Sequence, residues 1–330
     1  MKILITGATG YVGHRLALTL AERNNEIHIL VRNPNSDNIP LHKNIRVFAG
    51  DITDRQSIPA AINGCKQVYH IAAMVKPFDK DPSLFHKVNV EGTRNLLAIA
   101  LKTGVKKFVF TSSCSVIGPS VKAAMCEIDA RITPLDNDYD NTKFLAENIV
   151  KEYSHKGLFT VIVSPSKVFG PCGFETHAIS VNKVINKFIK GRLSIIPKPG
   201  NLIANYCFID DVIEGHILAM SKGINGEKYI VGGENISYKE LFQAIRMLTG
   251  TKAWLIEIPK HFVKVLALLQ WIQYKTTLKE PFITEKSIQQ IFCNKIFSSE
   301  KATRELGYSI TPMKESLKKT IHFLKNQNHV

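Results

Sequence analysis

Several features that mark specialised protein classes are missing from this sequence of 330 residues. Its six cysteines form no Cys-x-x-Cys pair and have no histidine at metal-ligand spacing, so we predict no metal site and reduced thiols in a cytoplasmic protein. Long apolar runs are missing too, because the opening stretch ends at Thr6-Gly7 and residues 265–274 are interrupted by two glutamines. We therefore expect neither a signal peptide nor a transmembrane segment.

Acidic residues are scarce relative to basic ones, with 28 Asp and Glu against 43 Lys and Arg, a net charge of +15. Such an excess attracts anions, from phosphorylated cofactors to acidic substrates, nucleic acid or an anionic membrane. The lysines are scattered, however, and aromatic residues are not interleaved with a basic stripe as a nucleic-acid surface requires. We expect a small-molecule substrate and no nucleic-acid partner.

The first half of the chain alternates strand and helix patterns. Helices are predicted over Asn89–Lys102 and Tyr139–Glu152, the second capped by a residue among 136–138. This alternation predicts an α/β fold, a doubly wound parallel sheet of the Rossmann type with helices on both faces. The expected strands are Lys2–Thr6, Glu26–Val31, Ile45–Ala49, Gln67–Ala73, Lys107–Thr111 and Phe159–Ser164.

After Pro165 the pattern becomes irregular and mostly helical. We predict a nucleotide-binding domain over residues 1–165 plus about 203–222, and a smaller, mostly helical substrate domain over 166–202 and 223–330. The cleft between the two domains would bind the substrate. The helices expected here are Val181–Lys190, Asp211–Ser221, Lys239–Thr249 and Lys260–Tyr274.

A glycine motif, TGATGYVG over residues 6–13, lies between the first strand and the first helix. Its glycines recur every three residues, which permits a tight turn and a close approach of backbone to a pyrophosphate at the helix N-terminus. In that position the motif predicts a dinucleotide cofactor. The residues expected to contact it are Gly7, Thr9, Gly10, Tyr11, Val12 and Gly13.

The end of the second strand indicates which nucleotide is bound. An acidic residue there would bind the ribose 2′-hydroxyl of NAD, but the strand runs into Arg32, which can pair with a 2′-phosphate. We therefore expect NADP(H) to be favoured over NAD(H); the alternative is a solvated arginine. Asp51 follows the third strand, where it can bond the adenine edge or cap the next helix.

Tyr139 and Lys143 form a Tyr-x-x-x-Lys pair on one face of a predicted helix. A free tyrosine has a pKa of about 10, and a neighbouring ammonium would lower it toward the range of acid–base catalysis. Ser113, at the end of the fifth strand, can hold a substrate oxygen beside Tyr139. Alone, the pair could be a solvated contact on a helix surface; with the glycine motif it predicts catalysis.

With these motifs in family order, the chain resembles the extended short-chain dehydrogenase/reductases of the NAD-dependent epimerase/dehydratase family over nearly its whole length. The resemblance implies Ser113, Tyr139 and Lys143 as catalytic residues, with Lys143 also on the nicotinamide ribose, and it allows a homodimer through the Tyr139 helix and the helix before it. The resemblance also implies that Asp211 caps a helix. The remaining cofactor contacts that it implies are Arg32, Asp51, Ile52, Ala72, Ala73, Pro165 and Val168.

Three departures from the patterns of other family members indicate which branch of the family the chain resembles. Ser164 and Lys167 stand where nucleotide-sugar epimerases usually carry Arg and Asn. Those enzymes also tend to carry Arg before a Tyr-Ile-His-Val stretch, whereas residues 204–208 of this chain are Ala-Asn-Tyr-Cys-Phe. Cys114-Ser115 replace the Asp-Glu of dehydratases. The chain looks most like the group of dihydroflavonol-4-reductase-like, hopanoid-associated epimerase-like and 3β-hydroxysteroid dehydrogenase-like proteins.

The sequence thus predicts an NADP(H)-dependent oxidoreductase acting on CH–OH groups, which interconverts a ketone and a secondary alcohol on a small or lipophilic, non-nucleotide substrate. The alternatives are an NAD-retaining nucleotide-sugar epimerase and a non-catalytic dinucleotide sensor. Residues 261–279 are interpreted as the apolar face of a substrate-domain helix, with contact to an anionic membrane as the alternative. The residues expected to line the substrate cavity are Lys167, Cys172, His177 and Tyr206.

Overall fold

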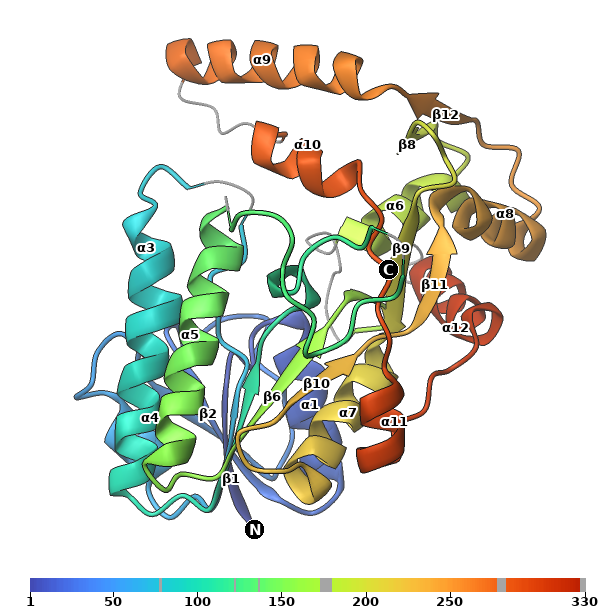
Figure 1. The fold of residues 1–330 in the computed structure, drawn as a ribbon. Helices are drawn as coiled ribbons and strands as arrows, with labels where there is room; N and C mark the ends of the chain where they lie inside the picture. The colour runs from blue at the N-terminus through green and yellow to red at the C-terminus, as the bar shows by residue number, and fades with distance from the viewer. Residues whose placement is uncertain (77–78, 122, 136, 173–179, 278–282, 327–330) are drawn as a thin grey trace.

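The computed structural model describes residues 1–76, 79–121, 123–135, 137–172, 180–277 and 283–326. A seven-stranded sheet of order β10-β6-β5-β4-β1-β2-β3 forms its centre, and every neighbouring pair runs parallel (Figure 1). The predicted α/β fold is thereby confirmed. The strands are β1 (Lys2–Thr6), β2 (Glu26–Val31), β3 (Ile45–Ala49), β4 (Gln67–His70), β5 (Lys107–Thr111), β6 (Thr160–Pro165) and β10 (Lys228–Val231).

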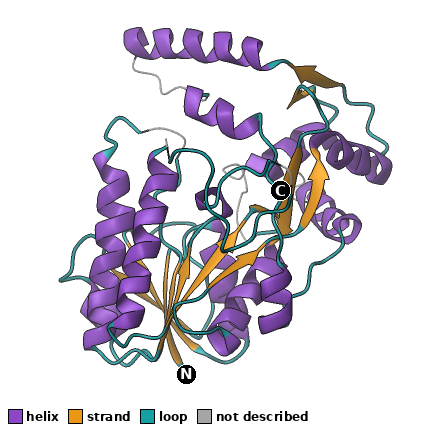
Figure 2. Ribbon diagram, viewed as in Figure 1, coloured by secondary structure: helices purple, strands orange, loops and turns teal. Residues whose placement is uncertain are grey.

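Helices cover both faces of this sheet (Figure 2). Successive strand residues point to opposite faces, so Ile3 and Ile5 join one buried core while Leu4 joins the other. Because both faces are buried, the strands read as continuous apolar runs. One face packs against α1 (Tyr11–Glu22) and α7 (Ile209–Lys222), the other against α2 (Ile58–Ile62), α4 (Gly92–Lys102) and α5 (Asp138–His155).

Element ends differ from the predicted ones where side chains compete for backbone groups. Strand β4 ends at His70, three residues early, because the Ala72 amide donates to the Thr6 hydroxyl at 3.3 Å. The helix expected from residue 89 begins earlier, as α3 (Ser83–His86) and a π-helical turn, Lys87–Glu91, precede α4. Helix α5 has the predicted type of cap, since Asn137 Oδ1 accepts the Asp140 amide at 2.7 Å.

The C-terminal half adds two small sheets, β11-β9-β7 and β12-β8. Strand β10 falls in the range that we assigned to the second domain, yet it pairs with β6 in the main sheet; the domain division otherwise stays a prediction. The strands are β7 (Lys167–Phe169), β8 (Ser194–Pro197), β9 (Ile203–Phe208), β11 (Glu234–Ser237) and β12 (Leu255–Ile258). The helices are α6 (Ser180–Ile189), α8 (Tyr238–Thr249), α9 (Lys260–Thr277), α10 (Glu285–Ile291), α11 (Glu300–Leu306) and α12 (Met313–Asn326).

Candidate active site

The carboxyl ends of the parallel strands gather the predicted site residues at one edge of the sheet. Gly7 follows β1, Arg32 follows β2, Asp51 lies two residues after β3, and Ala72 and Ser113 each lie two residues after β4 and β5. Strands β1 and β4 are neighbours although the chain leaves β1 toward β2, so the strand order reverses between them. Open α/β sheets bind ligands in the crevice at such a reversal.

The glycine loop is a cradle in which side chains do not fit. Gly7 has φ +77°, and a Cβ there would lie 2.6 Å from the Ala72 amide nitrogen. A Cβ on Gly13 would lie 2.2 Å from the Gly7 carbonyl oxygen, so α1 must pack directly against the loop. Gly10 caps α1 without a side-chain hydrogen bond, which leaves the first helical N–H groups for an anion. These residues fit the pyrophosphate of a dinucleotide.

The other predicted residues of this loop hold it in place. The Tyr11 hydroxyl donates to the Gly170 carbonyl at 2.8 Å, and burial raises the pKa of Tyr11, so this donor stays protonated. Thr9 and Val12 are half-buried on either side of it. The loop is therefore tied to the segment that follows β7.

Arg32 and Asp51 lie at the ends of β2 and β3. Arg32 is exposed, with Asn33 beside it. Asp51 accepts the Thr53 amide at 2.8 Å and so organises its own turn. Ile52 is buried, and a Cβ on Gly92 of α4 would lie 2.8 Å from its Cδ1. Half-buried Ala73 follows Ala72 along the same edge.

A buried polar chain beneath this edge was not predicted from the sequence. His70 bonds the Thr6 hydroxyl through Nδ1 at 2.7 Å and the Thr93 hydroxyl through Nε2 at 2.8 Å. Burial, with Lys143 nearby, lowers the pKa of His70 to about 3, so the ring is neutral. Asn89 accepts the Met74 amide at 2.7 Å and links that loop to α5. The Asn-Val-Glu-Gly-Thr stretch at residues 89–93 was the available signal.

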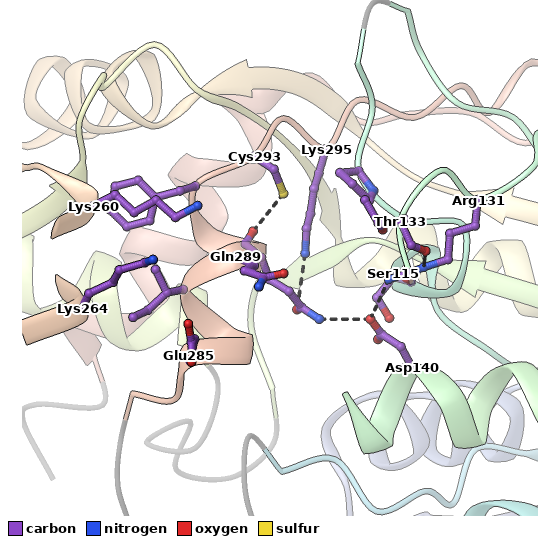
Figure 3. A pocket seen from close by; sticks show the side chains of 15 residues that line it. Ser115, Arg131, Thr133, Asp140, Lys260, Lys264, Glu285, Gln289, Cys293 and Lys295 are labelled. Carbon is purple, nitrogen blue, oxygen red and sulfur yellow. Dashed lines mark hydrogen bonds and ion pairs between the residues drawn. The ribbon is translucent and has the colours of Figure 1, made fainter. Parts of the chain in front are cut away.

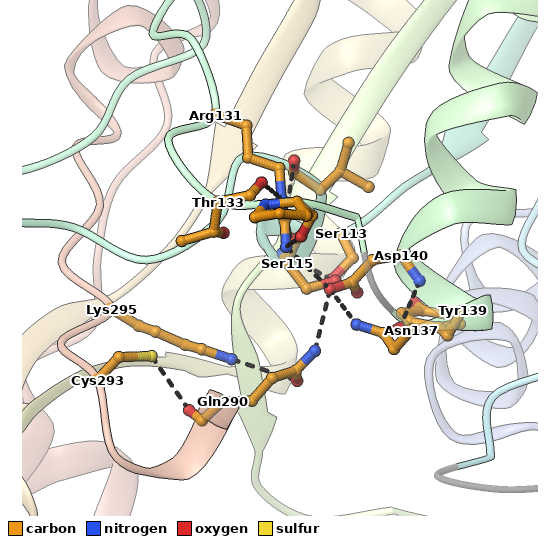
Figure 4. A network of polar contacts seen from close by, with 12 residues as sticks. Ser113, Ser115, Arg131, Thr133, Asn137, Tyr139, Asp140, Gln290, Cys293 and Lys295 are labelled. Carbon is orange, nitrogen blue, oxygen red and sulfur yellow. Dashed lines mark hydrogen bonds and ion pairs between the residues drawn. The ribbon is translucent and has the colours of Figure 1, made fainter. Parts of the chain in front are cut away.

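Ser113 and Tyr139 are brought together by β5 and the first turn of α5. Ser113 caps a 3₁₀ turn over Cys114–Val116, where its Oγ accepts the Ser115 amide at 3.1 Å and the Ser115 hydroxyl at 2.9 Å. Its side chain also lies close enough to the Tyr139 hydroxyl to lower the pKa of that phenol. Figure 4 shows the two side chains with their polar neighbours.

The ionisation of this site differs from our expectation. Burial raises the pKa of Tyr139 to about 12; the nearby Ser113 side chain opposes this shift and the charge of Asp140 reinforces it. The Lys143 ammonium lies 4.1 Å from the centre of the Phe110 ring and donates to the Thr111 carbonyl at 2.6 Å. Burial lowers the pKa of Lys143 to about 7. The expected lowering of the tyrosine pKa by this ammonium is therefore not what the structure shows.

Glu147, one turn beyond Lys143 on α5, is a second buried charge that sequence reasoning missed. It accepts the Ser112 hydroxyl at 2.5 Å and pairs with Lys228 of β10 at 2.8 Å. Its charge raises the pKa of Lys143 and so opposes the effect of burial. Nothing in the sequence connects Glu147 to Lys228, which is 81 residues away.

A cavity of about 260 Å³ opens beside these residues, between the loop after β5, the start of α5, and helices α9 and α10 (Figure 3). Asp140 lies on its wall, where its carboxylate accepts a hydrogen bond from Gln290 Nε2 of α10 at 3.0 Å. Arg131 Nη2 lies 3.6 Å from the same carboxylate. Figure 4 follows this connection across the cavity. The charged residues of the lining are Arg131, Asp140, Lys260, Lys264, Glu285 and Lys295.

Two lysines near this cavity have neutral partners. Lys295 donates to Gln290 Oε1 at 3.5 Å, and Lys167 donates to the Tyr238 hydroxyl at 2.8 Å. Among the described residues no carboxylate lies within 4.0 Å of either ammonium. Burial lowers the pKa of Lys167 to about 8; burial and the charge of Lys167 lower that of Lys295. Neither ammonium therefore has a carboxylate in direct contact, although the charge of Asp140 acts on Lys295 from farther away.

The chain is similar to known proteins over most of its length. Residues 3–232 match the family described as the NAD dependent epimerase/dehydratase family. The chain belongs to that family. It is 31% identical to sterol demethylase protein B of Methylococcus capsulatus over 93% of each chain, and 28% identical to a 3-beta-hydroxysteroid dehydrogenase of Mycolicibacterium neoaurum over 93% of this chain and 86% of that one. The crystal structure of gox2253 matches with a TM-score of 0.81 and 30% identity over 99% of both chains.

In this member of the epimerase/dehydratase family, several residues that we predicted to line the substrate cavity or to cap a helix lie elsewhere. Tyr206 is 3% exposed and packs in the core, and Cys172 is buried beside Tyr11, so neither lines the cavity described above. Asp211 is not a cap: it lies inside α7 and accepts the Thr311 amide at 2.8 Å. His177 lies outside the described residues. Pro165 is buried at the end of β6, and Val168 is half-buried in β7.

Proposed function

We propose that this protein is an NADP(H)-dependent oxidoreductase that interconverts a ketone and a secondary alcohol on a small or lipophilic substrate without a nucleotide. The observation that carries the proposal is that Ser113 and Tyr139 are close enough for Ser113 to lower the pKa of the Tyr139 phenol, at the edge of the sheet that holds the glycine cradle. The two relatives support the same class, because their names describe a hydroxysteroid dehydrogenase and a sterol-demethylating protein.

The chemistry divides between the cofactor and the chain. When bound, the nicotinamide supplies or accepts the hydride. Tyr139, whose pKa burial raises to about 12, is a phenol at neutral pH and can donate a proton to the oxygen of a ketone that Ser113 orients. Lys143, with a pKa of about 7, exists in both protonation states near neutral pH. It can therefore return a proton toward Tyr139 through solvent.

The preference for NADP(H) rests on Arg32, an exposed guanidinium directly after β2. A guanidinium can form paired hydrogen bonds with a 2′-phosphate. Thermal-shift titration with NADP⁺ and NAD⁺ in parallel should rank NADP⁺ first, and Arg32→Ala should remove most of that preference. Equal affinity in the wild-type protein would contradict the assignment.

The charges near the cavity add a constraint on the substrate. Because Lys167 and Lys295 lack a carboxylate partner among the described residues, we propose that the substrate carries an anionic group near the reacting carbon. The test compares a ketosteroid with its analogue bearing a carboxylate on the neighbouring carbon. Lys295→Met should raise KM for the acid by about tenfold and leave the neutral analogue nearly unchanged. An equal loss for both substrates would refute this role.

The decisive experiment for the reaction uses Tyr139→Phe. Wild-type protein should oxidise NADPH in the presence of a lipophilic ketone, and the variant should lose this turnover while NADP⁺ binding is retained. Epimerisation of a nucleotide sugar with no net cofactor turnover would replace the proposal by the epimerase alternative. Cofactor binding without turnover of any ketone, alcohol or nucleotide sugar would favour a sensor.

We also propose a cytoplasmic homodimer built on α4 and α5. The two helices pack side by side on one face of the sheet, and the Phe144 side chain is 40% exposed on α5. All six cysteines are free, which suits a reducing compartment. Light scattering should give the mass of a dimer, and Phe144→Glu should give that of a monomer.

A further inference from the structure

The outer face of α9 exposes an unusual amount of apolar side chain. Helix α9 lies along the top of the molecule in Figure 1, above α10. Only Ala267 of this helix is buried. Seven large apolar side chains are between 46% and 61% exposed: Phe262, Val265, Leu266, Leu268, Leu269, Trp271 and Ile272. The interpretation of this segment as a face packed inside the substrate domain is therefore wrong for most of the helix.

The small β8–β12 sheet, which leads directly into α9, has an apolar outer face as well. Ile195 and Ile256 are partners in the strand register and are 58% and 44% exposed. Leu193 and Trp254, which directly precede β8 and β12, are 51% and 77% exposed. Single exposed apolar residues need no explanation, but eleven of them on α9, on the paired strands β8 and β12, and directly before those strands mark an interaction surface.

The charge around this surface is positive. Between residues 252 and 277 there are four lysines and a single acid, Glu257, whose carboxylate accepts the Gly200 amide at 3.0 Å. At 100° per residue, Lys264 and Lys275 lie on one flank of α9, beside the stripe formed by Val265, Leu269 and Ile272. An exposed apolar stripe with lysines at its border is the pattern of a helix that lies in the interface of an anionic membrane.

We propose that the outer faces of α9 and the β8–β12 sheet, the α9 surface, dock on an anionic lipid bilayer with α9 in the plane of the interface. The helix lies on the membrane and does not span it: none of the described helices is both long and apolar enough to cross a bilayer. Eighteen residues give α9 a length of about 27 Å.

The cavity lies directly behind this surface. Lys260 and Lys264 of α9 line it together with residues of α10, as Figure 3 shows. Docking would therefore hold the cavity at the lipid headgroups, where a lipophilic substrate can enter without crossing water. Membrane binding itself depends only on the α9 surface and not on the proposed reaction.

The experiment is flotation of the full chain with vesicles of equal parts phosphatidylglycerol and phosphatidylcholine, compared with vesicles of phosphatidylcholine alone. We expect binding to the anionic vesicles that weakens as salt is raised. The double variant Val265→Glu, Leu269→Glu places two charges on adjacent turns of the apolar stripe and should reduce binding by about tenfold or more. Met247→Glu is the matched control, because Met247 is 82% exposed on α8, outside the α9 surface.

Circular dichroism and the thermal shift with NADP⁺ verify that each variant is folded. Folded wild-type protein that fails to float with anionic vesicles at low salt would overturn the proposal. So would a wild-type dimer that Val265→Glu, Leu269→Glu converts to a monomer without any vesicle binding, since the occupant would then be a second copy of the chain. Turnover is not measured in this experiment, so its failure leaves the proposed reaction standing, and failure of the reaction leaves membrane binding standing.

Discussion

Replacing Lys143 by methionine should make the protein more stable near neutral pH while removing its activity. Lys143 is 2% exposed, and its ammonium has two described partners, the Thr111 carbonyl and the Phe110 ring. Burial lowers its pKa from 10.5 to about 7, so the folded state disfavours the charged form. Methionine of similar length keeps the packing and removes the charge.

The magnitude follows from the two pKa values. Each pKa unit corresponds to 1.36 kcal/mol. At pH 7 the unfolded chain holds a proton on Lys143 that the folded state binds only half of the time, which reduces the free energy of unfolding by about 4 kcal/mol. The unfolded lysine loses its proton as pH rises toward 10.5, so this loss shrinks to about 2 kcal/mol at pH 9. Wild-type stability should therefore rise with pH through this window.

Urea unfolding of wild-type protein and Lys143→Met at pH 7 and pH 9 measures the effect. Losing the bond to Thr111 costs the variant about 1 kcal/mol, so we expect a net gain of about 3 kcal/mol at pH 7 and about 1 kcal/mol at pH 9. A stability difference between the variant and the wild-type protein that does not narrow from pH 7 to pH 9 would refute the reasoning. Lys228→Met is the control with the opposite sign, because it leaves Glu147 buried without its ion-pair partner and should destabilise by about 3 kcal/mol.

Two further predictions concern the backbone contacts that shape the site. Gly13→Ala places a Cβ against the Gly7 carbonyl, so it should destabilise the protein by about 1–3 kcal/mol and weaken NADP⁺ binding in thermal-shift titration. Gly104→Ala, whose Cβ would have nothing within 4 Å, should leave the affinity for NADP⁺ unchanged. Asn205→Leu removes a buried amide that donates to the Gly233 carbonyl at 2.7 Å and accepts its amide at 2.8 Å; urea unfolding should show a loss of about 3 kcal/mol, and a loss below 1 kcal/mol would contradict it.

The sequence was sufficient for the main sheet and for the residues along its edge. Strands β1, β2, β3 and β5 begin and end where the apolar runs do. For the mostly buried strands β1, β2 and β5, burial on both faces leaves little choice of register, whereas β3 is an edge strand with three exposed residues. Once the strands are parallel, residues that follow different strands must lie at one edge. Glycine spacing was equally informative, since the contacts of Gly7 and Gly13 leave no room for a side chain.

The parts that could not be predicted depend on contacts between distant segments. The direction of the Lys143 side chain is fixed by a carbonyl and a ring on β5, and its spacing from Tyr139 says nothing about either. The bond from Gln290 to Asp140 joins α10 to α5 across 150 residues. Apolar periodicity in α9 predicted a helix correctly, but the same pattern fits a face buried in protein and a face offered to lipid.

One buried lysine, Lys143, and three half-buried ones, Lys167, Lys228 and Lys295, differ in whether a carboxylate pairs with them. Lys228 has a carboxylate at 2.8 Å, and such a pair is expected of a charge that only supports the fold. The ammonium groups of Lys143, Lys167 and Lys295 directly contact neutral groups among the described residues, while Glu147 acts on Lys143 and Asp140 on Lys295 from farther away; burial lowers the pKa of each. Burying a charge against neutral groups lowers stability, so selection for folding alone would replace these lysines. The positions of Lys143 on the Tyr139 helix and of Lys167 and Lys295 near the cavity are explained if the missing negative charge arrives with the ligands: the cofactor for Lys143, and the acidic group of the substrate for Lys167 and Lys295.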